Sequence, residues 1–181
     1  MSTPETAHLD FESWLAFEAA SSEVRHELVG GNVYAMTGAM RRHNLLAASM
    51  LAAVRPAAMA DGCRAYVADM KVRVGADGYY PGVMVACDEP PDDRFEDAPC
   101  LLVEVVSPST ETVDRREKLA AYTRLPSLRA YLIAHPDTPR IEVHRRHGGT
   151  WAQSVLGPGD SLVLECPKVE LSVDDLYQGV T

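Results

Sequence analysis

One short stretch of the chain, Leu101–Ser107 (LLVEVVS), constrains the fold more than any other segment. Successive side chains of a strand point to opposite faces. One face here is apolar up to Ser107, and the other carries Glu104 between Leu102 and Val106. This pattern predicts a central strand that is covered on both sides. Because an unpartnered carboxylate in such a strand costs several kcal/mol, Glu104 must be paired with a cation, protonated or bound to a metal ion.

Composition limits the classes of protein to consider. The chain has 181 residues, 46% of them hydrophobic and 24% charged, so we expect one globular domain over residues 1–181. No apolar run approaches the roughly 20 residues that cross a bilayer. The first residues show no basic segment followed by an apolar one, so we expect no signal peptide and a cytoplasmic location. The net charge of −9 argues against a general electrostatic grip on nucleic acid, but not against a local basic patch.

Hydrophobic periodicity and turn residues predict the elements around this strand. Helices are expected at residues 10–23, 41–59, 115–125 and 172–178. Strands are expected around a turn at 30–32, at 63–74 and 79–87 with a turn at 75–78 between them, at 101–107 and 128–135, and in a C-terminal antiparallel meander at 140–146, 151–156 and 161–166. The sequence of residues 88–99 indicates a polar loop. This mixed order predicts an α+β or mixed-sheet α/β fold, with helices flanking the sheet, and not a doubly wound one.

A lysine on the helix predicted at residues 115–125 is the first candidate partner of Glu104. With Asp114 as N-cap, Lys118 lies on the same stripe of the helix as Tyr122 and Leu125, which should face the sheet. The link from Ser107 to Asp114 is short, so we expect Lys118 and Glu104 to lie within about 6 Å of each other. Three interpretations stay open: a buried structural ion pair, a lysine that reaches past the sheet to solvent, and an active site.

Longer motifs carry a resemblance to a known family. The run "YYPGVMVACDE … PCLLVEVVSPSTETVDRREKLAAYTRLPSLRAYLIAHP" resembles the bacterial family of putative restriction endonucleases, within the PD-(D/E)XK nuclease superfamily. "RHELVGGNVYAMTGA", His43 and the C-terminal "LSVDDLY" extend the resemblance over nearly the whole chain. It implies a restriction-endonuclease-like mixed sheet flanked by helices, and Mg²⁺- or Mn²⁺-dependent hydrolysis of DNA phosphodiesters. Cleavage of both DNA strands would favour a homodimer.

The resemblance also implies roles for individual residues. Glu104 matches the metal-binding acid, and the backbone carbonyl of Val105 matches a further metal ligand. Val106 occupies the usual place of the lysine, so Lys118 from the following helix is the implied water-positioning base. Glu27 matches an accessory acid near the N-terminus. Carboxylate oxygens are the ligands that Mg²⁺ prefers, and the ion offsets the charge that develops on the phosphate.

One position departs from the family pattern. The family motif has Asp after the proline of "YYPGVMV", but here Pro81 is followed by Gly82. The chain therefore lacks an expected metal-binding carboxylate, and it is either a nuclease with an impaired site or an inactive nuclease-fold protein that acts as a binding module. Asp69 and Asp88 are the acids that could replace the missing one. Glycine in a strand also often marks a bulge.

Other polar residues are interpreted more simply. His43 is expected to be a core histidine on its helix stripe, whereas His135, His144 and His147 are expected to be solvated. Ser107 has neither the surrounding motif nor an evident base for a serine hydrolase. The cysteines form no C-x-x-C pair, so we expect buried free thiols, with a zinc site as the alternative; they are Cys63, Cys87, Cys100 and Cys166.

Two short basic clusters are the candidate contacts to DNA. They are Arg115–Arg116 at the start of the third predicted helix and His144–His147 in the C-terminal meander. Given the overall negative charge, we expect DNA binding to be weak, to depend on one of these patches and to fall steeply with salt.

Overall fold

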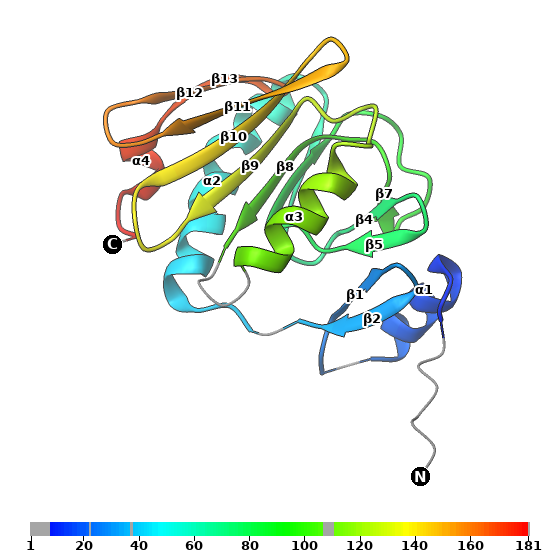
Figure 1. The fold of residues 1–181 in the computed structure, drawn as a ribbon. Helices are drawn as coiled ribbons and strands as arrows, with labels where there is room; N and C mark the ends of the chain where they lie inside the picture. The colour runs from blue at the N-terminus through cyan, green and yellow to red at the C-terminus, as the bar shows by residue number, and fades with distance from the viewer. Residues whose placement is uncertain (1–7, 22, 37, 107–110, 181) are drawn as a thin grey trace.

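The computed structural model describes residues 8–21, 23–36, 38–106 and 111–180, together with the side chains in these ranges except those of 111–115. Its centre is a six-stranded sheet with the strand order β11-β10-β9-β8-β6-β3 (Figure 1). The strands are β3 (Arg64–Val67), β6 (Val83–Ala86), β8 (Pro99–Val105), β9 (Ala130–His135), β10 (Arg140–His147) and β11 (Thr150–Leu156). The β8–β9 pair is parallel and every other pair in this sheet is antiparallel, so the sheet is mixed as expected.

Helices cover both faces of this sheet (Figure 1). The helix α2 (Arg41–Ala60) packs on one face, where Met50 and Val54 meet Val83 and Val103. The helix α3 (Glu111–Tyr122) packs on the other face, where Tyr122 belongs to the cluster of Met84, Leu102 and Ile133. All seven residues of β8 are buried, which confirms the prediction of a central strand covered on both sides.

A second sheet lies beside the first, with the strand order β2-β1-β5-β4-β7. Its strands are β1 (His26–Val29), β2 (Asn32–Ala35), β4 (Lys71–Val74), β5 (Asp77–Tyr79) and β7 (Phe95–Glu96). The helix α1 (Phe11–Ala20) begins after Asp10, whose carboxylate accepts a hydrogen bond from the Ser13 amide, and it buries Trp14 against this sheet. The β1–β2 hairpin turns at Gly30 and Gly31, whose φ angles of 57° and 80° suit glycine.

Two expected strands are each divided between the two sheets. The segment 63–74 forms β3 and β4, which are separated at Ala68, a non-glycine residue with a φ of 61°. The segment 79–87 breaks at Pro81–Gly82, so that Tyr79 ends β5 in one sheet and Val83 begins β6 in the other. Proline lacks the amide that a ladder needs, which accounts for the second break. The expected polar loop 88–99 also contains the short buried strand β7.

The C-terminal part differs from the expected meander. The strands β10 and β11 form an antiparallel hairpin, but β12 (Ser161–Glu165) pairs with β13 (Lys168–Ser172) in a separate two-stranded sheet. The strand β13 was not predicted from the sequence. The short helix α4 (Val173–Tyr177) follows, with the Ser172 hydroxyl accepting from the Asp175 amide as its N-cap. No described helix is both long and apolar enough to cross a membrane.

The boundaries of α3 correct a local prediction. The helix begins at Glu111, so Asp114 lies inside it and is not its N-cap. Residues 107–110, with Ser107 among them, lie outside the described part of the chain.

All four cysteines are paired in the structure, which corrects the expectation of free thiols. The pairs are Cys63–Cys87 and Cys100–Cys166. Their partners are distant in sequence and are brought together by strand pairing, a long-range feature that local patterns do not contain.

Candidate active site

Glu104 lies near the C-terminal end of β8, on the face that α3 covers. Its side chain is only 11% exposed. The strand places it on this face because Leu102 and Val106, two residues away on either side, also pack into the cluster beneath α3. A carboxylate at this depth requires polar partners, and the structure supplies them.

Lys118 is the central partner. Its ammonium Nζ lies 3.3 Å from Oε1 of Glu104 and 2.9 Å from Oε1 of Glu27. The lysine comes from α3 and Glu27 from β1, so three elements that are far apart in sequence meet here. The side chains of Lys118 and Glu27 are 6% and 11% exposed, respectively. The structure therefore brings together the three residues that the sequence singled out, at the distance expected for Glu104 and Lys118.

Two further groups donate hydrogen bonds to these carboxylates, and sequence reasoning missed both. The Tyr122 hydroxyl donates to Oε1 of Glu104 at 2.8 Å, and the backbone amide of Tyr80 donates to Oε1 of Glu27 at 3.1 Å. Tyr122 lies four residues after Lys118 on the same helix stripe, so its proximity to Glu104 could have been inferred from the periodicity. The Tyr80 amide carries no sequence signal.

Burial fixes the protonation state and orientation of Tyr122. Burial, and then the charges of the nearby Glu104 and Glu27 carboxylates, raise the pKa of Tyr122 well above its ordinary value. The hydroxyl therefore remains a donor across the physiological pH range. Edge-to-face contacts with Tyr79 and Tyr131, at 5.3 and 5.1 Å between ring centroids, hold the ring in place.

The oxygen atoms of this site are of the type that binds a hard divalent cation, but there are few of them. Glu27 and Glu104 contribute two carboxylates, and the Val105 carbonyl follows Glu104 directly in the chain. Oxygen ligands of this type suit Mg²⁺ or Mn²⁺. However, the Lys118 ammonium offsets one of the two negative charges, which reduces the attraction of these carboxylates for a cation.

Gly82 holds the position at which the family motif has an acid. It directly precedes β6, in which Val83 faces Val103 and Met84 faces Leu102, so Gly82 lies next to the end of β8 that carries Glu104. The backbone φ of Gly82 is not positive, so the position is not the strained bulge that the glycine suggested. A Cβ there would meet the Val103 carbonyl oxygen at 3.1 Å, which is a tight contact with buried backbone.

Neither of the two candidate replacement acids, Asp69 and Asp88, has a described contact with Glu104. The Asp69 side chain is 82% exposed and pairs with the Arg25 guanidinium. Asp88 is exposed and follows the far end of β6, where its carbonyl accepts from Arg64. Among the described contacts, neither residue takes the place of the acid that the family motif has at position 82.

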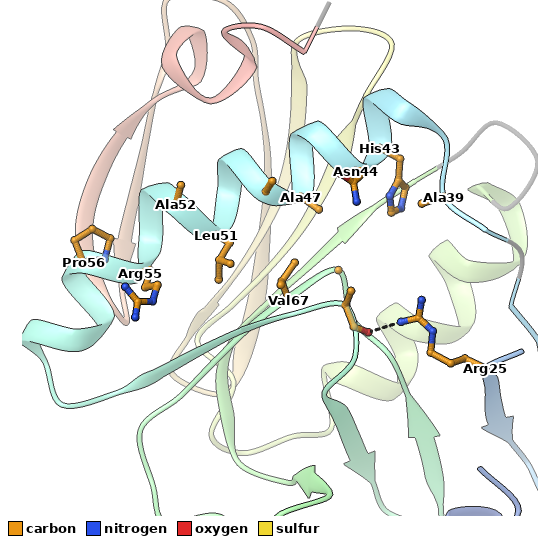
Figure 2. Close-up of a pocket in the computed structure, with 13 residues that line it drawn as sticks. Arg25, Ala39, His43, Asn44, Ala47, Leu51, Ala52, Arg55, Pro56 and Val67 are labelled. Atoms are coloured by element: carbon orange, nitrogen blue, oxygen red, sulfur yellow. Dashed lines mark hydrogen bonds between the residues drawn. The ribbon is translucent and has the colours of Figure 1, made fainter. Parts of the chain in front are cut away.

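A groove of about 600 Å³ runs from Gly82 along α2 (Figure 2). His43 and Asn44 lie at one end of its helical wall, and Arg55 lies at the other end. Arg25 lies on the opposite side, where its guanidinium donates to the Ala68 carbonyl at 3.2 Å. Arg25 and Arg55 are the arginines that line this groove, and Arg25 is paired with Asp69.

His43 connects the groove with the acidic site. Its side chain is half-buried, not a core histidine, and its ring is hydrogen-bonded to the backbone of Val105. Burial lowers the pKa of His43, the bond to Val105 opposes this shift, and the positive charge of Lys118 lowers the pKa further. The neutral ring is therefore favoured at neutral pH.

The C-terminal basic cluster has a structural role. Arg146 donates to the carbonyls of Leu128, Thr123 and Leu125, and its guanidinium lies over the Trp151 ring. His144 is buried and stacks on Tyr131, so the expectation of a solvated side chain is wrong for this residue.

The other side chains that were expected at the surface differ in their exposure. His135 is partly buried and lies 3.1 Å from Glu142, whereas His147 is exposed as predicted. Arg116 is exposed on α3, while the Arg115 side chain lies outside the described residues. Of these basic segments, the groove is the one that contains His43, whose ring is hydrogen-bonded to the backbone of Val105 next to Glu104.

This architecture defines a class of protein. A mixed sheet flanked by helices, with two carboxylates and a lysine gathered at the end of a central strand, is the arrangement that the restriction-endonuclease-like resemblance implied. The crystal structure of a "putative nuclease belonging to DUF820" from Anabaena variabilis has the same fold: its TM-score is 0.79, with 14% identity, and the match covers 96% of this chain and 99% of that one.

Sequence comparison identifies the family. The profile of the Uma2 family, described as "Putative restriction endonuclease", matches residues 10–174. Two uncharacterized proteins of Synechocystis sp. are similar to the chain, with 31% identity over 93% of it and 28% identity over 79% of it; the matches cover 91% and 84% of those proteins. The chain therefore belongs to the Uma2 family of putative restriction endonucleases.

Proposed function

We propose that the chain is a divalent-metal-dependent DNA endonuclease whose metal affinity is weakened by Gly82. The observation that carries the proposal is the position of the Lys118 ammonium between the Glu104 and Glu27 carboxylates at the end of a buried central strand. A lysine and two acids at such a depth cost stability unless each is paired. Buried charged groups beside a groove are typical of functional sites.

The residues divide into metal ligands and water-positioning groups. Glu104 and the Val105 carbonyl would hold Mg²⁺ or Mn²⁺, with Glu27 as an accessory acid. When bound, the ion would offset negative charge on a phosphodiester and lower the pKa of a coordinated water. Lys118 would orient that water and stabilise its deprotonated form, because the ammonium is held on a rigid helix by two carboxylates. Tyr122 fixes the orientation of the Glu104 carboxylate through its hydroxyl.

The groove along α2 supplies a path for the substrate. Arg25 and Arg55 on its border would contact phosphates, and His43 lies between the groove and Val105. Only a local contact of this kind is compatible with a net charge of −9, so binding to duplex DNA should be weak and sensitive to salt. Cleavage of both strands would require two such sites, and a homodimer would supply them.

The experiment combines metal binding with plasmid nicking. We expect calorimetry to show weak Mn²⁺ binding by the parent chain, and supercoiled plasmid to be nicked slowly in Mn²⁺. Glu104→Gln should abolish both Mn²⁺ binding and plasmid nicking, whereas Lys118→Met should abolish nicking. Glu165→Gln and Lys168→Met, which change the same charges at exposed positions of β12 and β13, serve as matched controls.

The second candidate function is a nuclease-fold binding module without catalysis, which the missing acid at Gly82 favours. In that case Lys118 serves only to neutralise Glu27 and Glu104. The module should bind no Mn²⁺ at Glu104, and Glu104→Gln should leave its DNA affinity unchanged. Metal binding that is lost in Glu104→Gln would exclude this alternative.

A further inference from the structure

The four cysteines form one cluster of sulfur atoms at the end of the six-stranded sheet remote from Glu104. Cys63 precedes β3, Cys87 follows β6, Cys100 lies at the start of β8, and Cys166 follows β12. Besides the two bonded pairs, Sγ of Cys87 lies 3.4 Å from Sγ of Cys166 and 3.9 Å from Sγ of Cys100. The sulfurs of Cys63, Cys87 and Cys166 all lie within 4.8 Å of one another.

Backbone pairing alone brings three of these residues together. Arg64 pairs with Ala86 across β3 and β6, which places Cys63 beside Cys87. Across β6 and β8 the register shifts between Val85 and Ala86, and Cys100 lies at this irregularity, with its Sγ 3.9 Å from Sγ of Cys87. The convergence is therefore set by sheet register and does not require bonds between the sulfurs.

The fourth cysteine is held in place by a separate contact. The Lys168 amide donates to Oδ2 of Asp61 at 3.0 Å, and this bond joins the β12–β13 turn to the segment that carries Cys63. Cys166 lies in that turn. Strand pairing and the bond from Lys168 to Asp61, none of which involves sulfur, thus contribute to the placement of the four cysteines.

The sulfur separations around Cys87 match a single tetrahedral ion. A zinc–thiolate bond of about 2.3 Å in a tetrahedral site separates neighbouring sulfurs by about 3.8 Å. The two non-bonded separations that involve Cys87, 3.4 and 3.9 Å, bracket this value. A larger metal cluster would hold its cysteine sulfurs further apart, so the spacing favours one ion.

We infer that the reduced chain binds one Zn²⁺ ion through the thiolates of Cys63, Cys87, Cys100 and Cys166. Four thiols lose four protons when the four zinc–sulfur bonds form, and no electrons are transferred. From the doubly disulfide-bonded chain, each bond must first accept two electrons and two protons from a thiol or phosphine reductant. The cytoplasm expected from the sequence supplies thiol reductants.

The set of ligands makes the site structural. All four positions of a tetrahedral ion are filled by protein, which leaves none for a substrate. The ion would link β3, β6, β8 and the β12–β13 turn at one end of the sheet. Cys87 is exposed and Cys166 is partly exposed, so an ion can reach the cluster from solvent.

The site is chemically distinct from the acidic site at the other end of β8. Thiolates select a soft or borderline ion, whereas Glu27 and Glu104 select a hard one. The inference does not rest on the proposed nuclease function, because a chain without nuclease activity keeps the same cysteines.

Cobalt substitution tests the inference directly. The full chain is purified anaerobically with a phosphine reductant, its zinc content is measured, and the metal-free reduced chain is titrated with Co²⁺. We expect one equivalent of ion, with the cobalt–thiolate charge-transfer absorption of a tetrahedral site. Zinc should raise the midpoint of thermal unfolding of the reduced chain by about 5 °C or more.

Variants identify the ligands. Cys87→Ser and Cys166→Ser should each shift or remove the thiolate absorption, whereas Glu104→Gln should leave it unchanged. Far-ultraviolet circular dichroism checks that the variants are folded. The inference is overturned if the folded reduced chain binds no Co²⁺ and all four thiols react freely with a thiol reagent. It is also overturned if both disulfides persist under reductant, or if the purified chain carries an iron–sulfur chromophore.

Discussion

Gly82 lies against Val103 and Val105, the two neighbours of Glu104 in β8. A Cβ at position 82 would meet the Val103 carbonyl oxygen at 3.1 Å and Cγ2 of Val105 at 3.8 Å. The position that carries an acid in the family motif is therefore next to the backbone of the strand that holds Glu104. We propose that an acid at this position would share a metal ion with Glu104 and the Val105 carbonyl.

Gly82→Asp should strengthen metal binding. The new carboxylate adds an oxygen ligand and a negative charge beside Glu104, so we expect Mn²⁺ affinity to rise by at least about tenfold, equal to about 1.4 kcal/mol. Plasmid nicking in Mn²⁺ should rise with it. Calorimetry and nicking rates of parent and variant measure the two effects. A parent that binds Mn²⁺ tightly and nicks as fast as the variant would show that another acid already serves the site.

Gly82→Ala is the matched control for that substitution. It adds the same Cβ, which meets the Val103 carbonyl oxygen at 3.1 Å, but no carboxylate. The crowding destabilises the fold, while loss of glycine from the unfolded chain stabilises it by about 0.4–1 kcal/mol. We expect a net change in the free energy of unfolding of about 1 kcal/mol or less, with no gain in Mn²⁺ affinity. A gain in Gly82→Ala would mean that backbone rigidity, not the acid, controls binding.

Lys118→Met should destabilise the fold. The substitution leaves two buried carboxylates, Glu27 and Glu104, without the ammonium that lies between them. Removal of one partner from a buried ionic set costs about 3–5 kcal/mol. Urea denaturation at neutral pH measures this loss. The double variant Lys118→Met with Glu104→Gln should recover part of it, because one uncompensated charge is gone; no recovery would show that the lysine stem, not its charge, is what matters.

The buried Tyr177 should give the fold a specific alkaline sensitivity. Its hydroxyl donates to the Arg140 carbonyl at 2.8 Å, and burial raises the pKa of Tyr177 to about 12. The pKa in the unfolded chain is about 10. A raised pKa means that the folded state favours the protonated form, so this contribution is complete below pH 10 and is lost as the pH rises from 10 through 12.

Tyr177→Phe measures that contribution. The variant should lose about 1 kcal/mol of the free energy of unfolding at pH 7, because it lacks the hydrogen bond to Arg140. Between pH 10 and 12 its stability should fall less steeply than that of the parent. Parallel slopes for the two proteins in urea denaturation over this range would contradict the assignment.

The parts of the site that could be predicted depend on local periodicity. Glu104 interrupts an alternating apolar strand, and Lys118 lies on the buried stripe of the next helix, so both inward orientations follow from the chain alone. Glu27 came from the family resemblance, because nothing in its local pattern indicates burial. Tyr122 could have been added from its spacing to Lys118, whereas the Tyr80 amide could not.

The parts that could not be predicted depend on long-range pairing. The division of 63–74 and 79–87 between two sheets is decided at Ala68 and Pro81–Gly82, although the strand propensity on both sides looks continuous. The convergence of the cysteines depends on the register of β3, β6 and β8. The internal role of Arg146 depends on carbonyls at the end of α3 and in the following loop, which come close only in the folded chain.

The groove beside the acidic site leads to a prediction about DNA. Arg25 and Arg55 border it, and Arg25 lies next to Gly82 through the Ala68 turn. Arg25→Ala together with Arg55→Ala should weaken duplex binding by about tenfold at low salt and reduce the salt slope by about 2, one for each lost phosphate contact. The matched control is Arg145→Ala, a partly buried arginine on β10 that donates to the Val163 carbonyl. Fluorescence anisotropy over a salt series measures both quantities. If the double variant binds DNA as the parent does while Arg145→Ala weakens binding, the DNA path lies over β10 and not along α2.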